Sequence, residues 1–230
     1  MKKTIIMSLG GSVIVPYNID IKFLKDFKKI IEKFVKKGFR FVIYCGGGKI
    51  ARDYQKAAFK FKVNNKDLDW LGIHATILNA NFVKILFGNL AENIIIKDPT
   101  KKIKFNKKII LAGGWKPGWS TDYDAVLLAK NLKVDTIINM SDIAYVYDKD
   151  PKKYLNTKRI KNICWRHYRK IAGNKWKAGL NKPFGPVAAK EAEELGLKVM
   201  IVGKNLRNFE NLLGNRKFKG TIITANNNKK

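Results

Sequence analysis

The sequence predicts an α/β protein in which a parallel sheet is covered by helices on both faces. Along its 230 residues, short apolar segments alternate with longer segments whose apolar residues recur at helical spacing. The short segments are apolar throughout, which is typical of parallel strands buried on both faces. No linker and no internal repeat interrupts this order. We therefore expect one domain over residues 1–225, followed by a frayed tail at 226–230.

The first half of the chain carries three expected strands and three expected helices. Asp20 is a suitable N-cap for a helix that places Phe23 and Phe27 on one face, and Gly38 ends that helix. Asp67 is expected to cap the third helix, which stops at Gly88. The expected elements are strands at 4–8, 39–45 and 94–96, and helices at 21–37, 49–61 and 68–87.

The second half continues the alternation, with one gap. Ser120 or Thr121 is expected to cap a helix that runs through Leu128. The stretch from Asp148 to about Gly185 shows no readable period, and we expect it to be irregular. The other expected elements are strands at 109–112, 134–139, 198–202 and 221–224, and helices at 187–195 and 209–213.

The chain is strongly basic, with 47 Lys and Arg against 18 Asp and Glu and a formal net charge of +29. Such a charge raises nucleic-acid binding as a hypothesis. The basic residues are mostly lysine and are spread along the whole chain, without the arginines and interleaved aromatics that favour base or phosphate recognition. We therefore expect no specific nucleic-acid partner.

The two cysteines and the apolar segments indicate where in the cell the protein is located. Cys45 and Cys164 make neither a disulfide framework nor a zinc site, and are expected to be small buried side chains in a reducing cytoplasm. The apolar start is broken by Gly10 and Gly11, so it indicates a first strand rather than a signal peptide. No apolar run approaches the roughly 18–20 residues of a membrane span. A cytoplasmic protein without membrane contact is predicted.

Three of the expected strands end in glycine-rich turns, at residues 10–12, 46–48 and 113–114. Ligands of open parallel sheets bind beyond the carboxyl ends of the strands. Glycine permits close approach of the backbone to a phosphate, and amides at a helix N-terminus then bind it. Three such turns at one edge predict a site for phosphorylated ligands. Neither of the two common glycine fingerprints, GxxxxGK[ST] and GxGxxG, is present.

Charged and aromatic residues flank this glycine edge, and each has a second interpretation. Asp122 is either an acid that organises the cations around a transferring phosphoryl group or a first-turn acid that complements the helix dipole. Asp69 is either a sugar-hydroxyl acceptor or a solvated helix residue, and Arg52 either faces the edge or lies at the surface. Trp115 and Trp119 either stack on a base or anchor their loop.

Several segments, in order, resemble the amino acid kinase family and, within it, the archaeal-type uridylate (UMP) kinases. The segments that carry the resemblance are SLGGSVIVP at 8–16, CGGGKIARDY at 45–54, DWLGIHATILNA at 69–80, GGWKPGWSTDYDAVLLAK at 113–130, YDKDPKKY at 147–154, KAGLNKPFGPVAAK at 177–190 and KFKGTII at 217–223. The resemblance covers nearly the whole chain. It implies a three-layer αβα sandwich with a mainly parallel sheet, transfer of the ATP γ-phosphoryl group to UMP with Mg²⁺, and a homo-oligomer, a hexamer built on dimers.

The resemblance also implies a role for particular residues. Asp122, Arg52 and Lys153 would be catalytic, with no metal ligand assigned. The implied ATP-binding residues are Gly11, Ser12, Gly48, Arg52, Ser141, Tyr147 and Asp150. The implied UMP-binding residues are Gly47, Asp69, Trp115, Lys116, Pro117, Gly118, Trp119, Ser120 and Thr121. No general base is needed, because the acceptor phosphate is already an oxyanion and the reaction requires alignment of two anions.

Some positions depart from the family pattern. Ser8 stands where many members have lysine, and the archaeal branch also lacks that lysine. Ile143-Ala144-Tyr145-Val146 replaces Val-Asp-Gly-Val on the ATP side, where Asp142 can compensate. Gly185 replaces an Asp, which removes a helix cap. The altered loop at 115–119 keeps open a sibling kinase with another small phosphorylated acceptor. A member that has lost catalysis and binds nucleotide or RNA is the remaining alternative.

Overall fold

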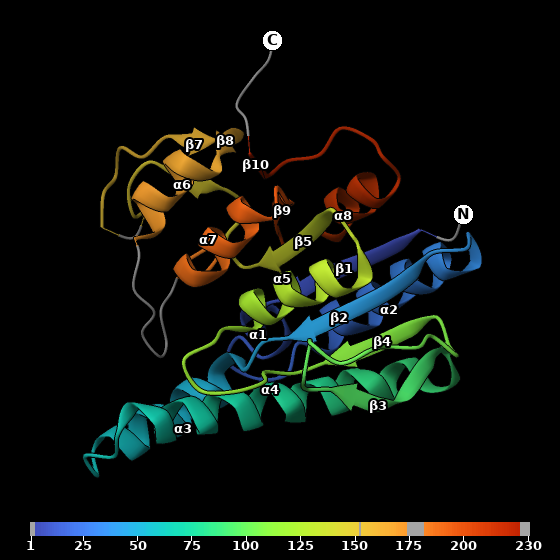
Figure 1. Ribbon diagram of the computed structural model, residues 1–230, viewed down its shortest axis with the longest axis horizontal. Helices are drawn as coiled ribbons and strands as arrows, with labels where there is room; N and C mark the ends of the chain where they lie inside the picture. The colour runs from blue at the N-terminus through green and yellow to red at the C-terminus, as the bar shows by residue number, and fades with distance from the viewer. Residues whose placement is uncertain (1–2, 152, 174–181, 226–230) are drawn as a thin grey trace.

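The computed structural model describes residues 3–151, 153–173 and 182–225 and contains a central eight-stranded sheet (Figure 1). The strand order is β3-β4-β2-β1-β5-β9-β10-β8. Neighbouring strands are parallel except for the antiparallel pair β9 and β10. The strands are β1 (Thr4–Leu9), β2 (Arg40–Cys45), β3 (Ala91–Ile96), β4 (Ile109–Ala112), β5 (Thr136–Ser141), β8 (Asn162–Cys164), β9 (Lys198–Gly203) and β10 (Thr221–Thr224). A separate two-stranded ribbon consists of β6 (Val146–Tyr147) and β7 (Arg159–Ile160).

Helices cover both faces of the sheet, so the predicted three-layer αβα sandwich is confirmed. One face carries α1 (Gly11–Ile14), α2 (Ile21–Lys36), α4 (Asn65–Phe87) and α8 (Leu206–Leu213), and the other carries α5 (Thr121–Leu132), α6 (Trp165–Ala172) and α7 (Pro186–Glu194). The alternation of side chains along β1 explains the two cores. Met7 and Leu9 are buried in the first core, whereas Ile6 is buried in the second.

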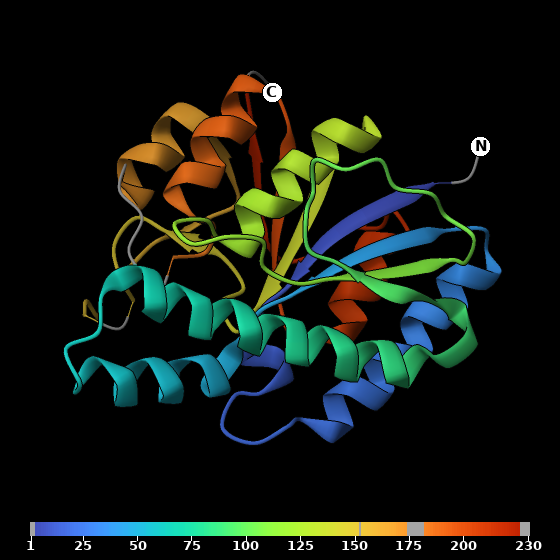
Figure 2. The same cartoon turned by 60° about the horizontal axis from the view of Figure 1, so that its bottom comes forward.

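Helix α3 (Gly48–Phe59) pairs with α4 as a long hairpin, and a short 3-10 turn, η1 (Gly88–Leu90), follows α4. Figure 2 shows the tip of the α3–α4 hairpin extending beyond the body of the sheet. The start of α3 directly follows β2, and the middle of α4 reaches the same point, where Asn79 Nδ2 donates to the Gly46 carbonyl at 2.7 Å. The hairpin therefore forms one wall of that edge.

Several local predictions are confirmed by hydrogen bonds. The Phe23 amide donates to Asp20 Oδ1 at 3.0 Å, so Asp20 caps α2, and Ser120 accepts from the Tyr123 amide at the start of α5. The expected cap at Asp67 is wrong. Asn64 caps α4 instead, because its side chain accepts from the Asp67 amide at 2.9 Å.

The expectation of an irregular segment from 148 to 185 is wrong for its middle. β7, β8 and α6 all lie within it. Trp165, Tyr168 and Ala172 share the buried face of α6, and the remaining positions of that helix are mostly basic. The predicted frayed tail at 226–230 lies outside the described residues, as does part of the late family segment, at 177–181.

In the described part of the chain, one segment, Asn65–Leu90, is long and apolar enough to cross a membrane by length and composition. The sequence expectation concerned uninterrupted apolar runs, and this segment is not one. The segment also carries Asn, His and Thr residues, which hide it from a search for uninterrupted apolar runs. Its inner face is part of the first core, where Ala80, Val83 and Phe87 pack against the sheet.

The two cysteines are free. Cys45 is fully buried at the end of β2, as predicted, and burial raises the pKa of its thiol. Cys164 is only half-buried, so the prediction is wrong for this residue. Its Sγ lies 3.4 Å from Nδ1 of His167 on the first turn of α6.

Candidate active site

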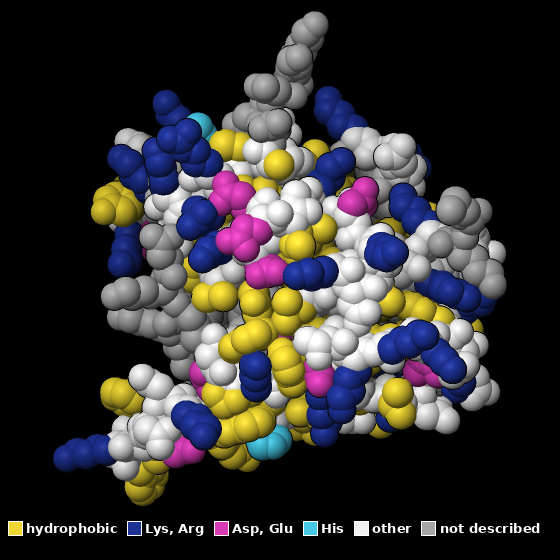
Figure 3. Space-filling view, in the orientation of Figure 1, with side chains coloured by type: hydrophobic (Ala, Val, Ile, Leu, Met, Phe, Trp, Pro, Cys, Tyr) yellow, Lys and Arg dark blue, Asp and Glu magenta, His cyan; other side chains and the backbone are white. Residues whose placement is uncertain are grey.

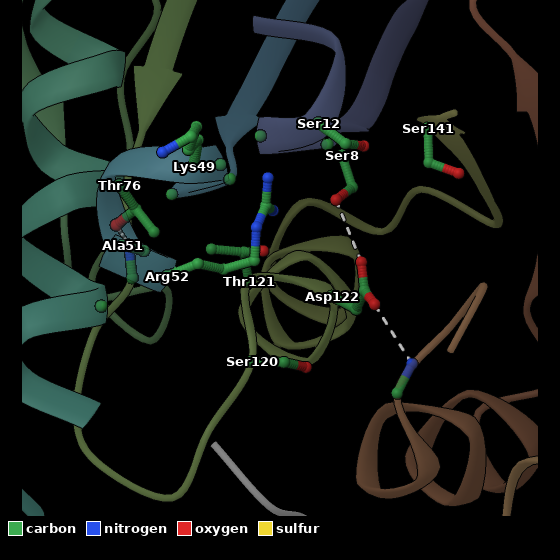
Figure 4. Close-up of a pocket in the computed structure, with 18 of the residues that line it drawn as sticks. Ser8, Ser12, Lys49, Ala51, Arg52, Thr76, Ser120, Thr121, Asp122 and Ser141 are labelled. Carbon is green, nitrogen blue, oxygen red and sulfur yellow. Dashed lines mark hydrogen bonds between the residues drawn. The ribbon is translucent and has the colours of Figure 1, made fainter. Parts of the chain in front are cut away.

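A cavity of about 800 Å³ opens beyond the carboxyl ends of β1, β2 and β5. All three glycine segments contribute to this edge, through Gly10 and Gly11, through Gly46 to Gly48, and through Gly114. The side chains of Figure 4 point into the cavity from the start of α3, from α4 and from the start of α5. The structure thus brings together segments that lie more than 100 residues apart in the chain.

The first two glycine turns pack backbone against backbone. A Cβ atom on Gly11 would collide with the Gly48 amide, and one on Gly46 would collide with the Gly11 amide. Gly48 itself has φ of +64°, which side chains rarely adopt. Glycine is therefore required here by contact between the turns, in addition to any approach of a phosphate. Gly48 and Lys49, at the start of α3, line the cavity, and the Lys49 amide donates to the Val15 carbonyl at 2.9 Å.

Asp122 is the most highly connected polar residue of the site. Its Oδ1 accepts from Ser8 Oγ at 3.0 Å and from Asn139 Nδ2 at 2.9 Å, and its Oδ2 accepts from the Gly185 amide at 3.1 Å. Removal of the carboxyl from water raises its pKa to about 6, although all three hydrogen bonds favour the charged form. Asp122 thus joins β1, β5 and the start of α7 and carries its negative charge at the cavity wall.

Positive side chains surround the same cavity. Arg52 reaches into it from the second turn of α3 (Figure 4), and its guanidinium donates to the Pro16 carbonyl at 3.3 Å. Three lysines also line the cavity: Lys49, Lys182 and Lys204. Sequence reasoning missed all three. Lys204 directly follows Gly203 at the carboxyl end of β9, and that position is the signal that could have identified it.

The loop at 115–119 is held from two helices. The Trp115 amide donates to Asp124 Oδ2 at 3.1 Å, and the Gly118 amide donates to Asp69 Oδ2 at 2.7 Å. Asp124 is fully buried, which raises its pKa well above the ordinary range. Asp69 lines the cavity, so its carboxylate supports the loop at the edge of the site.

The two tryptophans of this loop pack against each other, with ring centroids 5.1 Å apart. Lys116 Nζ lies 4.0 Å from the Trp115 ring centroid and 4.2 Å from that of Trp119. Trp119 lines the cavity together with Ser120 and Thr121, whereas the residues 115–118 do not. The geometry favours an anchoring role for Trp115 and leaves Trp119 at the site.

On the predicted ATP side the structure separates two groups. Gly11, Ser12, Gly48 and Ser141 line the cavity. Tyr147, Asp150 and Lys153 lie on β6 and the turn after it, outside the cavity lining. Asp142, which sequence analysis offered as a compensating acid, does line the cavity, and its Oδ1 accepts from Ser12 Oγ at 3.0 Å.

Two uncharged polar residues of the site were also missed. Asn139 lies near the carboxyl end of β5 and donates to Asp122, and Thr76 of α4 accepts from the Gly114 amide at 2.7 Å. A polar residue near the carboxyl end of an apolar strand is the signal for Asn139. Thr76 gives no such signal, because it looks like any polar residue of a helix.

Comparison with known proteins assigns the family. The sequence model of the amino acid kinase family matches residues 3–203. The chain is 33% identical to a uridylate kinase of Thermococcus sibiricus over 95% of this chain and 98% of that relative, and 34% identical to one of Thermococcus kodakarensis over the same shares.

Among solved structures, the uridylate kinase of Archaeoglobus fulgidus superposes with a TM-score of 0.79 at 27% identity, over 96% of this chain and all of that one. The sequence match and the superposition both span nearly the whole described sheet and the cavity at its edge. The chain belongs to the amino acid kinase family.

Proposed function

We propose that this chain is a phosphotransferase that uses ATP to convert UMP to UDP. The observation that carries the proposal is the cavity in which Asp122, Arg52 and the glycine turns of β1 and β2 meet. Uridylate kinases of two Thermococcus species match almost the full length, which supports UMP as the acceptor. An oxygen of the acceptor phosphate attacks the γ-phosphorus, and the bond from that phosphorus to the β–γ bridging oxygen breaks, which yields UDP and ADP.

The residues divide into a donor side and an acceptor side. Gly11, Ser12, Gly48 and Ser141 are proposed to bind ATP. The proposed acceptor residues in the cavity are Gly47, Asp69, Trp119, Ser120 and Thr121, and Trp115, Lys116, Pro117 and Gly118 shape their loop. The contacts of Tyr147, Asp150 and Lys153 with ATP remain expectations from the resemblance.

Two negatively charged phosphate chains repel one another, and the cavity residues can offset that repulsion. Arg52, Lys182 and Lys204 supply positive charge, and the N-terminus of α3, at Gly48, supplies the positive end of a helix dipole. Asp122 fixes Ser8, Asn139 and the start of α7 around these cations. Its ionised carboxylate is proposed to hold the cations in position, without taking a proton from the acceptor.

Mg²⁺ fits the site as an ion held mainly by phosphate oxygens. No group of three or more His, Cys, Asp or Glu residues suited to a metal occurs within 3–151, 153–173 and 182–225. The oxygens of Asp122 already accept three hydrogen bonds, whereas the exposed Asp142 receives one, from Ser12. Asp142 is therefore the residue proposed to contact the ion. Bound Mg²⁺ would neutralise phosphate charge.

We further propose a cytoplasmic homo-oligomer, a hexamer by family resemblance, in which residues 1–225 act as one domain. Exposed apolar side chains on the α3–α4 hairpin support self-association; they are Tyr54, Phe59, Phe61, Leu78 and Ile85, with exposed fractions from 57% to 81%. The free thiols of both cysteines support a reducing compartment. Sedimentation velocity tests the assembly, which a purely monomeric protein at micromolar concentration would contradict.

A direct test follows the phosphorus atoms. Incubation with ATP, UMP and Mg²⁺ should produce equal amounts of ADP and UDP, identified by ³¹P NMR. Production of ADP without UDP would indicate ATP hydrolysis or another acceptor. The cage of Trp115, Lys116 and Trp119 favours a sibling kinase as the second candidate, because it gives the acceptor loop an unusual composition.

A further inference from the structure

The hydroxyl of Tyr168 binds both backbone groups of one distant residue. It donates to the Phe184 carbonyl at 2.6 Å and accepts from the Phe184 amide at 2.8 Å. Both residues are fully buried. The hydroxyl thereby supplies a hydrogen-bond partner to both buried backbone groups of Phe184. A tyrosine of α6 is thus fastened to the residue that precedes the cap of α7.

The next residue along the chain is Gly185, the N-cap of α7, and its amide donates to Asp122 Oδ2 at 3.1 Å. Because Gly185 has no side chain, it contacts the Asp122 carboxylate through this backbone amide. The direction of the amide is set by the peptide plane that joins Phe184 to Gly185. The orientation of Phe184 therefore controls one of the three donors that Asp122 receives.

Aromatic packing holds this arrangement rigid from the other side. The Trp165 ring lies 5.9 Å from that of Tyr168 and 5.8 Å from that of Phe184, measured between centroids. Trp165 Nε1 also donates to the Leu197 carbonyl at 2.7 Å. Helix α6 is therefore tied to the segments at both ends of α7. The start of α7 has little freedom to move relative to Tyr168.

We propose that Tyr168 is a positioning residue that acts through Phe184 and Gly185 to hold the amide donor on Asp122 and so keep that carboxylate ionised. The inference rests on the proposed function, in which an ionised Asp122 is required for phosphoryl transfer. It assigns a role in the reaction to α6, a helix whose residues do not line the cavity in the described part of the chain.

The charges around Asp122 determine the sign of the effect. Ser8 and Asn139 are neutral donors, and Asp124, in the same first turn of α5, is a buried acid whose own pKa is raised by burial and by Asp122. Arg52, Lys182 and Lys204 face the cavity. Burial already places the pKa of Asp122 at about 6. Loss of the Gly185 donor removes stabilisation of the charged form, so the pKa rises further and the carboxyl becomes protonated near neutral pH.

The test compares two substitutions that each delete one buried tyrosine hydroxyl. Tyr168→Phe removes the hydroxyl that holds Phe184. Tyr44→Phe is the matched control, because Tyr44 is equally buried and its hydroxyl has no hydrogen-bond partner among the described residues. The carboxyl of Asp122 is titrated by ¹³C NMR in protein labelled at Asp Cγ, and Asp122→Asn identifies its signal. The pH profile of UDP formation is measured in parallel.

We expect Tyr168→Phe to raise the pKa of Asp122 by about one unit, as the loss of a hydrogen bond to a charged group predicts. The acid limb of the activity profile should move to higher pH by the same amount. Activity of this variant should recover at alkaline pH. Tyr44→Phe should change neither the NMR titration of Asp122 nor the pH profile of UDP formation.

An unchanged Asp122 titration in folded Tyr168→Phe would overturn the inference, even if thermal stability fell, because that result describes a purely structural tyrosine. If Tyr168→Phe does not fold, Tyr168→Met deletes the same hydroxyl with a flexible apolar side chain that adapts to the space of the ring, and the same shift is required of it. Wild-type protein that makes no UDP would refute the proposed function, whereas the NMR titration would still decide the role of Tyr168.

Discussion

Ser8 Oγ donates to Asp122 Oδ1 at 3.0 Å, and the two residues lie 114 positions apart in the sequence. The bond joins the buried end of β1 to the first turn of α5 across the edge of the sheet. Asn139 of the neighbouring strand β5 donates to the same oxygen. A carboxylate held in this way serves as a fixed charge rather than a mobile one.

The stability of the protein should depend on the ionisation of Asp122. Its pKa in the folded state, about 6, lies above its ordinary value of 3.8, so protonation favours folding. The contribution of this group to stability therefore falls as the pH rises from about 4 to about 6. Asp122→Asn lacks this dependence, and its stability relative to wild type should increase across that window by up to about 3 kcal/mol.

Urea unfolding of wild type and Asp122→Asn at pH 4, 5, 6 and 7 measures this difference. Asn introduces an N–H group that cannot accept from the Gly185 amide, so the variant can be less stable than wild type at every pH. The slope with pH is the predicted quantity. A difference that stays constant from pH 4 to pH 7 would contradict the raised pKa.

A side chain at position 47 tests whether the backbone there approaches the acceptor phosphate closely. From the sequence alone, Gly47→Val is expected to abolish acceptor binding in an intact fold. A Cβ on Gly47, however, would lie 2.6 Å from Ala51 Cβ, so the substitution strains α3 as well. The double variant Gly47→Ala with Ala51→Gly removes that collision.

We expect the double variant to bind UMP at least about tenfold more weakly than the single control Ala51→Gly, a difference of about 1.4 kcal/mol. Isothermal titration with UMP gives the affinities, and circular dichroism verifies the fold. Equal UMP affinity in the two proteins would mean that Gly47 serves only the turn.

Asp142 should determine how much Mg²⁺ the reaction needs. Asp142→Asn keeps an oxygen for Ser12 but removes the charge, so the Mg²⁺ concentration for half-maximal rate should rise by about tenfold at fixed ATP. Asp26→Asn, an exposed acid on α2 paired with Lys22, is the control. If both variants require as much Mg²⁺ as wild type, Asp142 does not contact the ion.

The basic surface should bind nucleic acid only weakly and without sequence preference. In Figure 3 the Lys and Arg side chains are scattered over the visible face rather than gathered into one patch. Fluorescence anisotropy with single-stranded RNA should detect binding at 50 mM salt that is lost by 200 mM, because counterion release dominates. Sequence-selective binding that persists at physiological salt would support the alternative of a nucleotide- or RNA-binding member without catalysis.

The sequence predicted the elements whose pattern is local. Continuous apolar strands, the Asp20 cap and the glycine-terminated strand ends each follow from short-range rules of burial and backbone geometry. Gly11 and Gly47 were predicted as site residues because they stand beside recognisable strand ends, and Asp122 because it stands at a helix start next to a cap residue. They line one cavity because parallel strands end at one edge.

The remaining features depend on contacts that no short segment contains. Helix α6 was missed because its buried face carries only Trp165, Tyr168 and Ala172 among basic residues. Thr76 and Lys182 acquire a place at the site only when α4 and the segment before α7 pack beside it. The packing of Trp115 on Trp119 likewise favours an anchoring role for Trp115, which composition left open.

The central claim is best tested by one acceptor panel. ADP release from ATP and Mg²⁺ is measured with UMP, CMP, GMP and AMP, for wild type and for Asp122→Asn. UMP should be used far faster than the other three, and the variant should bind nucleotides while its turnover falls by about 10²–10³, the typical cost of one preorganised electrostatic contact. Failure of wild type to phosphorylate any of the four would contradict the uridylate kinase assignment, and normal turnover by Asp122→Asn would contradict the role of that carboxylate.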